Sequence, residues 1–223
     1  SFATDKLHFM DHNPAGSDVP AQSKDWSKVW NPDPGGGFWF EWSEADRVLG
    51  GRVSPNEDDC DLMLWCQNHG AGRTLPVHSQ VCPVLTGTLF DDRELARTYL
   101  HTGGRWVNLA DTDRGNGRWE LCHYPIEGGP PVQQAGDWGA SGDLADAPVV
   151  AVVSEDGKYV FGIAWQNAAS ILSNALIPCI HADPVWPQTP QGRAAVVRGK
   201  LYLMEGSLDD LLARVKREII NRS

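Results

Sequence analysis

The residues best suited to chemistry lie in one short run, Cys179-Ile180-His181-Ala182-Asp183. In an extended chain alternate side chains point the same way, so Cys179, His181 and Asp183 would share one face. An imidazole beside a carboxylate can act as an oriented base, and the same pair can serve as metal ligands. Prolines on both sides of the run favour the alternative of an exposed connection whose polar groups satisfy the backbone.

A second polar patch lies in residues 75–84, which alternate as a strand does. His78, Gln80 and Cys82 fall on one face, opposite the apolar positions. Such a face is either a concave binding surface or the solvated side of an ordinary strand. Arg73 precedes this strand and supplies a cation that could pair with a carboxylate on a substrate.

These residue types suit proton-transfer chemistry. Removing a proton next to a carboxylate requires a base and a positive charge that stabilises the developing enolate. We predict His78 or His181 as the base and an arginine, Arg73 or Arg105, as the cation. Asp183 would orient the imidazole, which completes the predicted catalytic set.

Tryptophan is abundant, with 10 residues against 4 tyrosines and 6 phenylalanines. Indoles either fill a core or offer a flat apolar face to a ligand such as a sugar ring. Trp138 lies in a long Gly-, Pro- and Asp-rich segment, 127–146, and we expect it to be an exposed indole at a rim. The predicted substrate-binding residues combine indoles with polar groups: Gln80, Trp138, Trp165, Trp186 and Asn174.

The sequence lacks the familiar motifs of hydrolases, nucleotide-binding proteins and zinc proteases. The chain has no GxSxG, no Walker loop, no GxGxxG after a strand and no HExxH. Its five cysteines show no zinc-finger spacing with histidine, and their odd number leaves at least one thiol outside any intrachain disulfide. We therefore predict no cofactor, while a divalent metal at His181 and Asp183 stays open.

Alternating apolar residues and turn signals predict a chain built mainly of strands. We expect strands over 38–42, 62–66, 75–84, 105–109, 118–124, 149–153, 158–165 and 193–204. The loop 111–117 has Asn-Gly turn chemistry, which predicts that the strands on either side of it pair with each other. Residues 91–100 are compatible with a helical turn or with a strand.

The hairpin around Asp156-Gly157 is the clearest local prediction, because Asp-Gly between apolar runs is a strong turn signal. On its second strand Phe161, Ile163 and Trp165 face one way, and Gly162 faces the other. Both faces are apolar, so we expect a deeply buried strand with bulk on one side and a close approach on the other.

One helix is expected, over 208–220. Ser207 is placed as its N-cap and Asp210 as the partner of a capping box. Apolar residues repeat at helical spacing and form a stripe that packs on the body: Leu208, Leu211, Leu212, Val215 and Ile219.

The absence of strand–helix alternation predicts an all-β fold. We expect a β-sandwich or jelly roll of antiparallel sheets closed by the C-terminal helix. The polar, proline-broken segment 1–37 is expected to be an irregular N-terminal arm, and 38–223 a single sandwich domain.

Charge and composition limit the partners. The net charge is 19 − 29 = −10, which disfavours general nucleic-acid binding. No apolar run approaches the roughly 20 residues of a membrane helix. The acidic, Trp-rich composition and the N-terminal Ser predict a secreted or periplasmic protein whose signal peptide has been removed. The oligomeric state is left open.

Three segments carry a resemblance to a known group: Ser173-Asn174, Cys179–Pro184 and Arg198–Gly206. They resemble the C-terminal part of exported bacterial β-sandwich proteins of unassigned function, grouped loosely with galactose-mutarotase-like, sugar-handling sandwiches. The resemblance covers the C-terminal third of the chain and part of 77–82. No mutarotase active-site signature matches residue by residue, so no residue role is carried over. The resemblance implies a carbohydrate ligand.

These observations lead to one expectation and two alternatives. We expect a carbohydrate-active enzyme that cleaves or modifies a polysaccharide, as a lyase or hydrolase, in a Trp-lined cleft of the sandwich. The alternatives are a non-catalytic carbohydrate-binding module and an envelope or interaction protein with most indoles buried. Convergence of aromatic and titratable side chains at one place would favour the enzyme or the module over the interaction protein.

Overall fold

The computed structural model describes residues 7–12, 30–43, 45–72, 77–115, 118–130, 132 and 138–221. Residues 7–12, 77, 78, 118 and 138 are described by their backbone alone.

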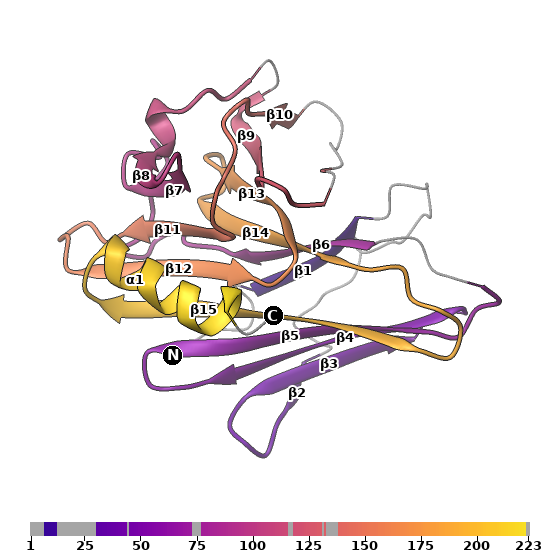
Figure 1. Ribbon diagram of the computed structural model, residues 1–223. Helices are drawn as coiled ribbons and strands as arrows, with labels where there is room; N and C mark the ends of the chain where they lie inside the picture. Colours follow the sequence, from indigo (N-terminus) through magenta and orange to yellow (C-terminus); the bar gives the residue numbers. More distant parts are fainter. Residues whose placement is uncertain are drawn as a thin grey trace.

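Two β-sheets form the body of the molecule, as expected for a β-sandwich (Figure 1). The six-stranded sheet runs in the order β1 (Leu7–His12), β6 (Val77–Pro83), β14 (Cys179–Trp186), β13 (Ala168–Asn174), β9 (Arg118–Pro125) and β10 (Trp138–Ala140). The nine-stranded sheet runs in the order β2 (Asn31–Pro32), β3 (Phe38–Ser43), β4 (Arg47–Pro55), β5 (Asp59–Asn68), β15 (Ala194–Glu205), β12 (Tyr159–Trp165), β11 (Val149–Val153), β7 (Thr98–Thr102) and β8 (Arg105–Asn108). Neighbouring strands are antiparallel, except that β10 is parallel to β9.

The core lies between the two sheets. Phe161, Ile163 and Trp165 of β12 enter it from the nine-stranded sheet, and Ile171 and Ile180 enter it from the other. These side chains are at most 5% exposed. Burying each such side chain contributes about 1.5–3 kcal/mol, so this layer supplies most of the driving force for folding.

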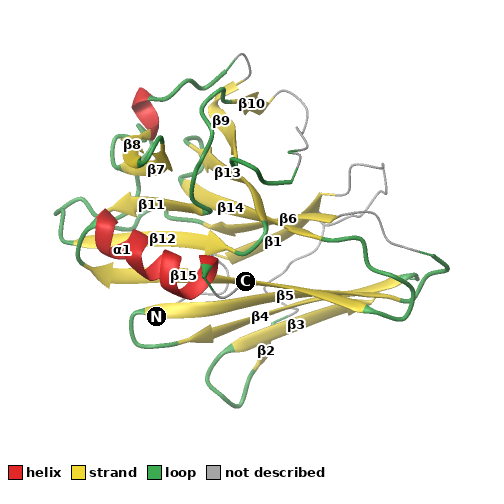
Figure 2. Ribbon diagram, viewed as in Figure 1, coloured by secondary structure: helices red, strands yellow, loops and turns green. Residues whose placement is uncertain are grey.

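A C-terminal helix covers the outside of the nine-stranded sheet (Figure 2). Helix α1 spans Leu208–Val215 and continues as a π-helical segment, η5, over Lys216–Ile220. Its apolar stripe packs on β11, β12 and β15 in a second cluster of buried side chains. The expected capping box is confirmed: Ser207 Oγ accepts from the Asp210 amide, and the Asp210 carboxylate accepts from the Ser207 amide. No helix among the described residues combines the length and apolar character that a membrane-crossing helix requires.

The predicted close approach on β12 is confirmed. A Cβ atom built on Gly162 would lie 2.7 Å from Cδ2 of Leu211, which is fully buried in α1. The missing side chain therefore lets the helix lie directly on the sheet.

A cluster of charges joins the helix to the interior strands β5 and β15. Asp59 of β5 accepts from Lys200 Nζ at 2.8 Å and from Arg214 Nη2 at 2.5 Å. Burial alone would raise the pKa of Asp59, but its bonds with Lys200 and Asn56 and the charge of Arg214 outweigh burial and lower it. Asp59 is thus held as a carboxylate between two cations from β15 and α1.

One predicted strand pairing is wrong. The strands expected over 105–109 and 118–124 form as β8 and β9, but they belong to different sheets: β8 pairs with β7, and β9 pairs with β13 and β10. Turn chemistry reports a local change of chain direction, and it carries no information about the strand that the chain joins next. Part of the segment 1–37 is also regular, because β1 and β2 lie within it.

Candidate functional site

Strand β14 confirms the expected extended conformation of residues 179–183. Ile180 and Ala182 point into the core between the sheets, whereas Cys179, His181 and Asp183 lie on the opposite face. We call this face, turned away from the nine-stranded sheet, the outer face of the six-stranded sheet. The three side chains are 3–4% exposed, so they do not form a solvated connection.

Hydrogen bonds join this face across three neighbouring strands. Ser170 of β13 donates its hydroxyl to Asp183 Oδ2 at 3.2 Å. His123 of β9 places Nδ1 3.3 Å from the same hydroxyl and 3.8 Å from Asp183 Oδ2. All three residues are at most 4% exposed. In this low-dielectric setting hydrogen bonds strengthen one another, so the row His123–Ser170–Asp183 holds its members in fixed orientations.

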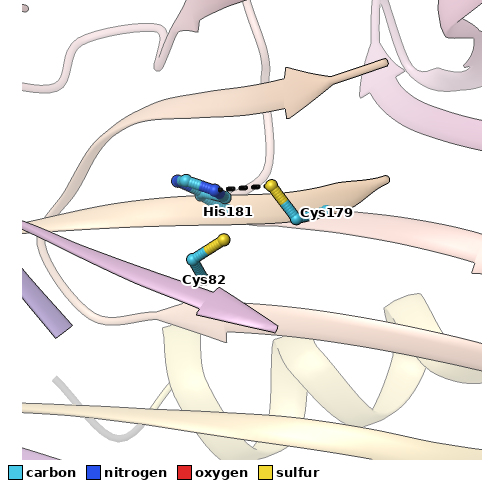
Figure 3. Close-up of side chains that lie close together, drawn as sticks. All are labelled: Cys82, Cys179 and His181. Atoms are coloured by element: carbon cyan, nitrogen blue, oxygen red, sulfur yellow. Dashed lines mark hydrogen bonds between the residues drawn. The ribbon is translucent and has the colours of Figure 1, made fainter. Parts of the chain in front are cut away.

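A thiol–imidazole cluster adjoins that row (Figure 3). Cys179 Sγ lies 3.2 Å from His181 Nε2, and the two residues come from one strand. Cys82 joins them from β6, and the ligand atoms of all three residues lie within 4.8 Å of one another. These three residues are the set that could hold a metal ion among those the structure describes. All five cysteines are buried, and none of them forms a disulfide.

The neighbours of His181 raise the pKa of its imidazole. Burial disfavours the charged form of His181, but the sulfur of Cys82 and the carboxylate of Asp183 together raise the pKa of His181 to about 10. The hydrogen bond with Cys82 and burial both raise the pKa of Cys179 well above that of a free thiol. His181 Nε2 thus faces the Cys179 sulfur, and its Nδ1 faces the Asp183 carboxylate.

Some polar atoms of the outer face have no hydrogen-bond partner among the described residues. They are Gln80 Oε1, His181 Nδ1 and Asp183 Oδ1. His181 Nδ1 and Asp183 Oδ1 lie 3.6 Å apart, close enough for an ion pair but long for a hydrogen bond. Buried groups of this kind normally find a hydrogen-bond partner, so these atoms mark the outer face as the candidate functional site.

The residues predicted to bind substrate do not all gather at this face. Gln80 lies on β6 and is 3% exposed. Trp165 and Trp186 are 0% and 4% exposed and belong to the core between the sheets. Asn174 ends β13, where its side-chain oxygen accepts from the amides of Leu176 and Ile177 and shapes the turn.

For three other predicted residues the structure describes the backbone alone or nothing at all. Arg73 lies outside the described residues. His78 is described as a backbone position of β6, opposite Val185 of β14. Trp138 is described as the first backbone position of β10. Their assigned roles stay predictions.

Sequence reasoning gave too little weight to His123, Ser170 and Trp119. His123 and Trp119 lie four residues apart in a strand that was predicted, but the register of β9 against β10 shifts between residues 118 and 122, so alternation does not relate their faces. Trp119 is 48% exposed, and the Arg114 guanidinium lies 5.1 Å from its ring centre. Ser170 had no signal, because β13 was not predicted and only the pairing of β13 with both β9 and β14 brings its hydroxyl between His123 and Asp183.

Comparison of the sequence with protein families and with curated proteins found no match. Comparison of the structure with solved structures found several. A putative aldose 1-epimerase from Escherichia coli K12 is 9% identical, with a TM-score of 0.42 over 76% of this chain and 66% of the other. The chain thus spans just under two thirds of that protein's length.

Two further solved structures are similar to the same extent. A galactose mutarotase related enzyme from Lactobacillus acidophilus is 9% identical, with a TM-score of 0.45 over 77% of this chain and 70% of the other. A polysaccharide lyase is 11% identical, with a TM-score of 0.42 over 84% of this chain and 24% of its own. At these identities and TM-scores the likeness is one of strand arrangement, and function has to be argued from the residues of this chain.

Proposed function

We propose that the protein is a carbohydrate-active enzyme that works by proton transfer on the outer face of the six-stranded sheet. The observation that carries the proposal is the buried row His123–Ser170–Asp183 across β9, β13 and β14. Asp183 orients the Ser170 hydroxyl by accepting its hydrogen bond, and the hydroxyl oxygen in turn contacts His123 Nδ1. The hydrogen bond at Nδ1 fixes the tautomer of the His123 imidazole. The second ring nitrogen, Nε2, is then the atom that exchanges a proton with substrate.

A carbohydrate suits this strand because Trp119, near the start of β9, is 48% exposed. The flat apolar face of a sugar ring stacks on an indole, and its hydroxyls meet the polar groups around it. The core positions of Trp165 and Trp186 leave Trp119 as the better supported platform. Trp138, His78 and Arg73 remain predicted contributors.

The polar groups favour elimination or epimerisation chemistry over hydrolysis. Among the described residues, Asp183 is the one carboxylate that contacts a histidine on this face. Most glycoside hydrolases use a pair of carboxylates flanking the scissile bond. An imidazole base together with a cation, the role predicted for Arg73, suits removal of a proton beside a uronate carboxylate. This is polysaccharide lyase chemistry.

The test is a screen of the full chain on neutral and uronic-acid polysaccharides and on free aldoses. A lyase releases products with a new C=C absorbance, a hydrolase releases reducing ends without it, and an epimerase changes optical rotation. We expect activity in wild type, and a fall of about 10²–10⁴-fold in His123→Gln, the range that general acid–base catalysis supplies.

The matched control is His69→Gln, because His69 is exposed at the end of β5. It should keep full activity. Full activity in His123→Gln would overturn the assignment of the base. Sugar binding by wild type with no product on any substrate would replace the enzyme by a binding module.

A further inference from the structure

Cys82, Cys179 and His181 converge from two neighbouring strands. The antiparallel register of β6 and β14 pairs His78 with Val185, and the isolated bridge pairs Val84 with Cys179. Between these pairs Cys82 lies opposite His181. The backbone thus brings two sulfurs and one imidazole nitrogen to the same point of the outer face, as Figure 3 shows.

We propose that these three residues bind a thiophilic transition-metal ion, Zn²⁺ being the best match. Zn²⁺ takes thiolate sulfur at about 2.3 Å and imidazole nitrogen at about 2.0–2.1 Å, so neighbouring ligand atoms of a tetrahedral site lie about 3.6–3.8 Å apart. The Cys179 Sγ–His181 Nε2 separation is 3.2 Å, and all three ligand atoms lie within 4.8 Å of one another. Small side-chain shifts would bring them to the bonding distances.

The surroundings of His181 have the form of a metal-bound histidine. Its Nε2 faces the sulfur, and its Nδ1 lies 3.6 Å from Asp183 Oδ1. A carboxylate behind the imidazole is the usual outer partner of a metal-binding histidine, because it fixes the ring and raises the basicity of the bound nitrogen. Asp183 is in turn held by the Ser170 hydroxyl at 3.2 Å. The unpartnered Nδ1 and Oδ1 atoms would then form the hydrogen bond that the two residues lack.

Burial distinguishes this cluster from a chance group of surface ligands. Cys82, Cys179 and His181 are 8%, 4% and 3% exposed. Binding the ion displaces the thiol protons and the proton on Nε2 to solvent, and the ion then neutralises the thiolates in a place where free charges are costly. Three protein ligands leave a fourth position for water or a substrate oxygen. This metal site shares Asp183 with the row His123–Ser170–Asp183, but its test measures metal binding and is separate from the test of activity.

Co²⁺ is the probe, because thiolate ligands give a cobalt site a charge-transfer absorption that nitrogen and oxygen ligands lack. The full chain is reduced, freed of metal with a chelator and titrated with Co²⁺. We expect one Co²⁺ per chain with a charge-transfer band, its displacement by Zn²⁺, and a Tm that rises with Zn²⁺ concentration because the ion binds the folded state. Native mass spectrometry of wild type gives the stoichiometry without any variant.

Variants locate the site. Cys82→Ser and Cys179→Ser should each lower the charge-transfer intensity and abolish the Zn²⁺ effect on Tm, whereas the matched control Cys60→Ser, at a buried thiol of β5, should behave as wild type. Asp183→Asn should weaken Zn²⁺ binding about 10–100-fold with the charge-transfer intensity unchanged, because Asp183 acts through His181. Reduced wild type without a charge-transfer band, or a band that survives in both Cys82→Ser and Cys179→Ser, would overturn the proposal.

Discussion

At the residue scale, the outer face of the six-stranded sheet buries polar groups that most strands leave in water. His123, Ser170, His181 and Asp183 are 3–4% exposed, and Gln80 is equally buried. Each such group costs free energy unless it is hydrogen-bonded. The Ser170 hydroxyl contacts both His123 and Asp183, and is therefore the link on which the row depends.

Ser170→Ala tests that link through stability. Removing the hydroxyl leaves Asp183 Oδ2 buried with one partner fewer, which should lower the free energy of unfolding by about 1–3 kcal/mol. Urea unfolding monitored by Trp fluorescence measures it. Ser43→Ala, at an exposed position of β3, is the control and should change the free energy by less than about 0.5 kcal/mol. Equal behaviour of the two variants would mean that the row contributes nothing to stability.

At the element scale, helix α1 depends on an absent side chain. Gly162 lies under Leu211, and its neighbours Val160 and Ala164 pack in the same cluster. The capping box at Ser207 starts the helix, but a helix of this length is marginal alone and is stabilised mainly by its packing on the sheet. The fit of α1 against β12 is therefore sensitive to added volume.

A double-mutant cycle tests the fit. Gly162→Val should destabilise the protein by about 1–3 kcal/mol, because its Cβ meets Leu211. Leu211→Ala should cost about 2–5 kcal/mol on its own, because it opens a cavity. The double variant should cost less than the sum, since each change relieves the other. Thermal or urea unfolding of the four proteins measures the coupling, and strict additivity would contradict the contact.

At the scale of the whole molecule, charges join parts that are distant in sequence. Asp59 binds Lys200 and Arg214, which come from the end of the chain, and Arg214 also reaches Asp58 at 2.7 Å. The folded protein lowers the pKa of Asp59 despite its burial. A carboxyl whose pKa is lowered on folding stabilises the protein above its unfolded pKa, and this contribution is lost as the pH falls through the folded value.

We therefore expect Tm to fall as the pH is lowered from about 5 to about 2, with Asp59 as one cause. Asp59→Asn should lower the free energy of unfolding at pH 7 by about 1–3 kcal/mol, because Lys200 and Arg214 each lose one buried carboxylate partner. It should also flatten the acid dependence of Tm measured by calorimetry. Glu205→Gln, at an exposed position of β15, is the control and should follow wild type. An acid profile of Asp59→Asn that parallels wild type would assign the loss to other carboxyls.

The local pattern of the sequence determined much of the architecture. Period-two alternation placed β3, β6, β9, β12 and β15, and it put Cys179, His181 and Asp183 on one face. Helical spacing and Ser207 placed α1. These features are readable because side-chain direction in a strand or helix follows from backbone geometry within a few residues.

Apart from the hairpin of β11 and β12, which the Asp156-Gly157 turn predicted, the tertiary structure decided which strands are neighbours. The order β6-β14-β13-β9 brings Cys82 to His181 and Ser170 to His123, over separations that no local pattern encodes. It also decided that Trp165 and Trp186 fill the core while Trp119 stays half exposed. The physical reason is that partner choice and burial follow from packing the whole chain into two sheets, whereas turn and strand signals report only the conformation of the residues that carry them.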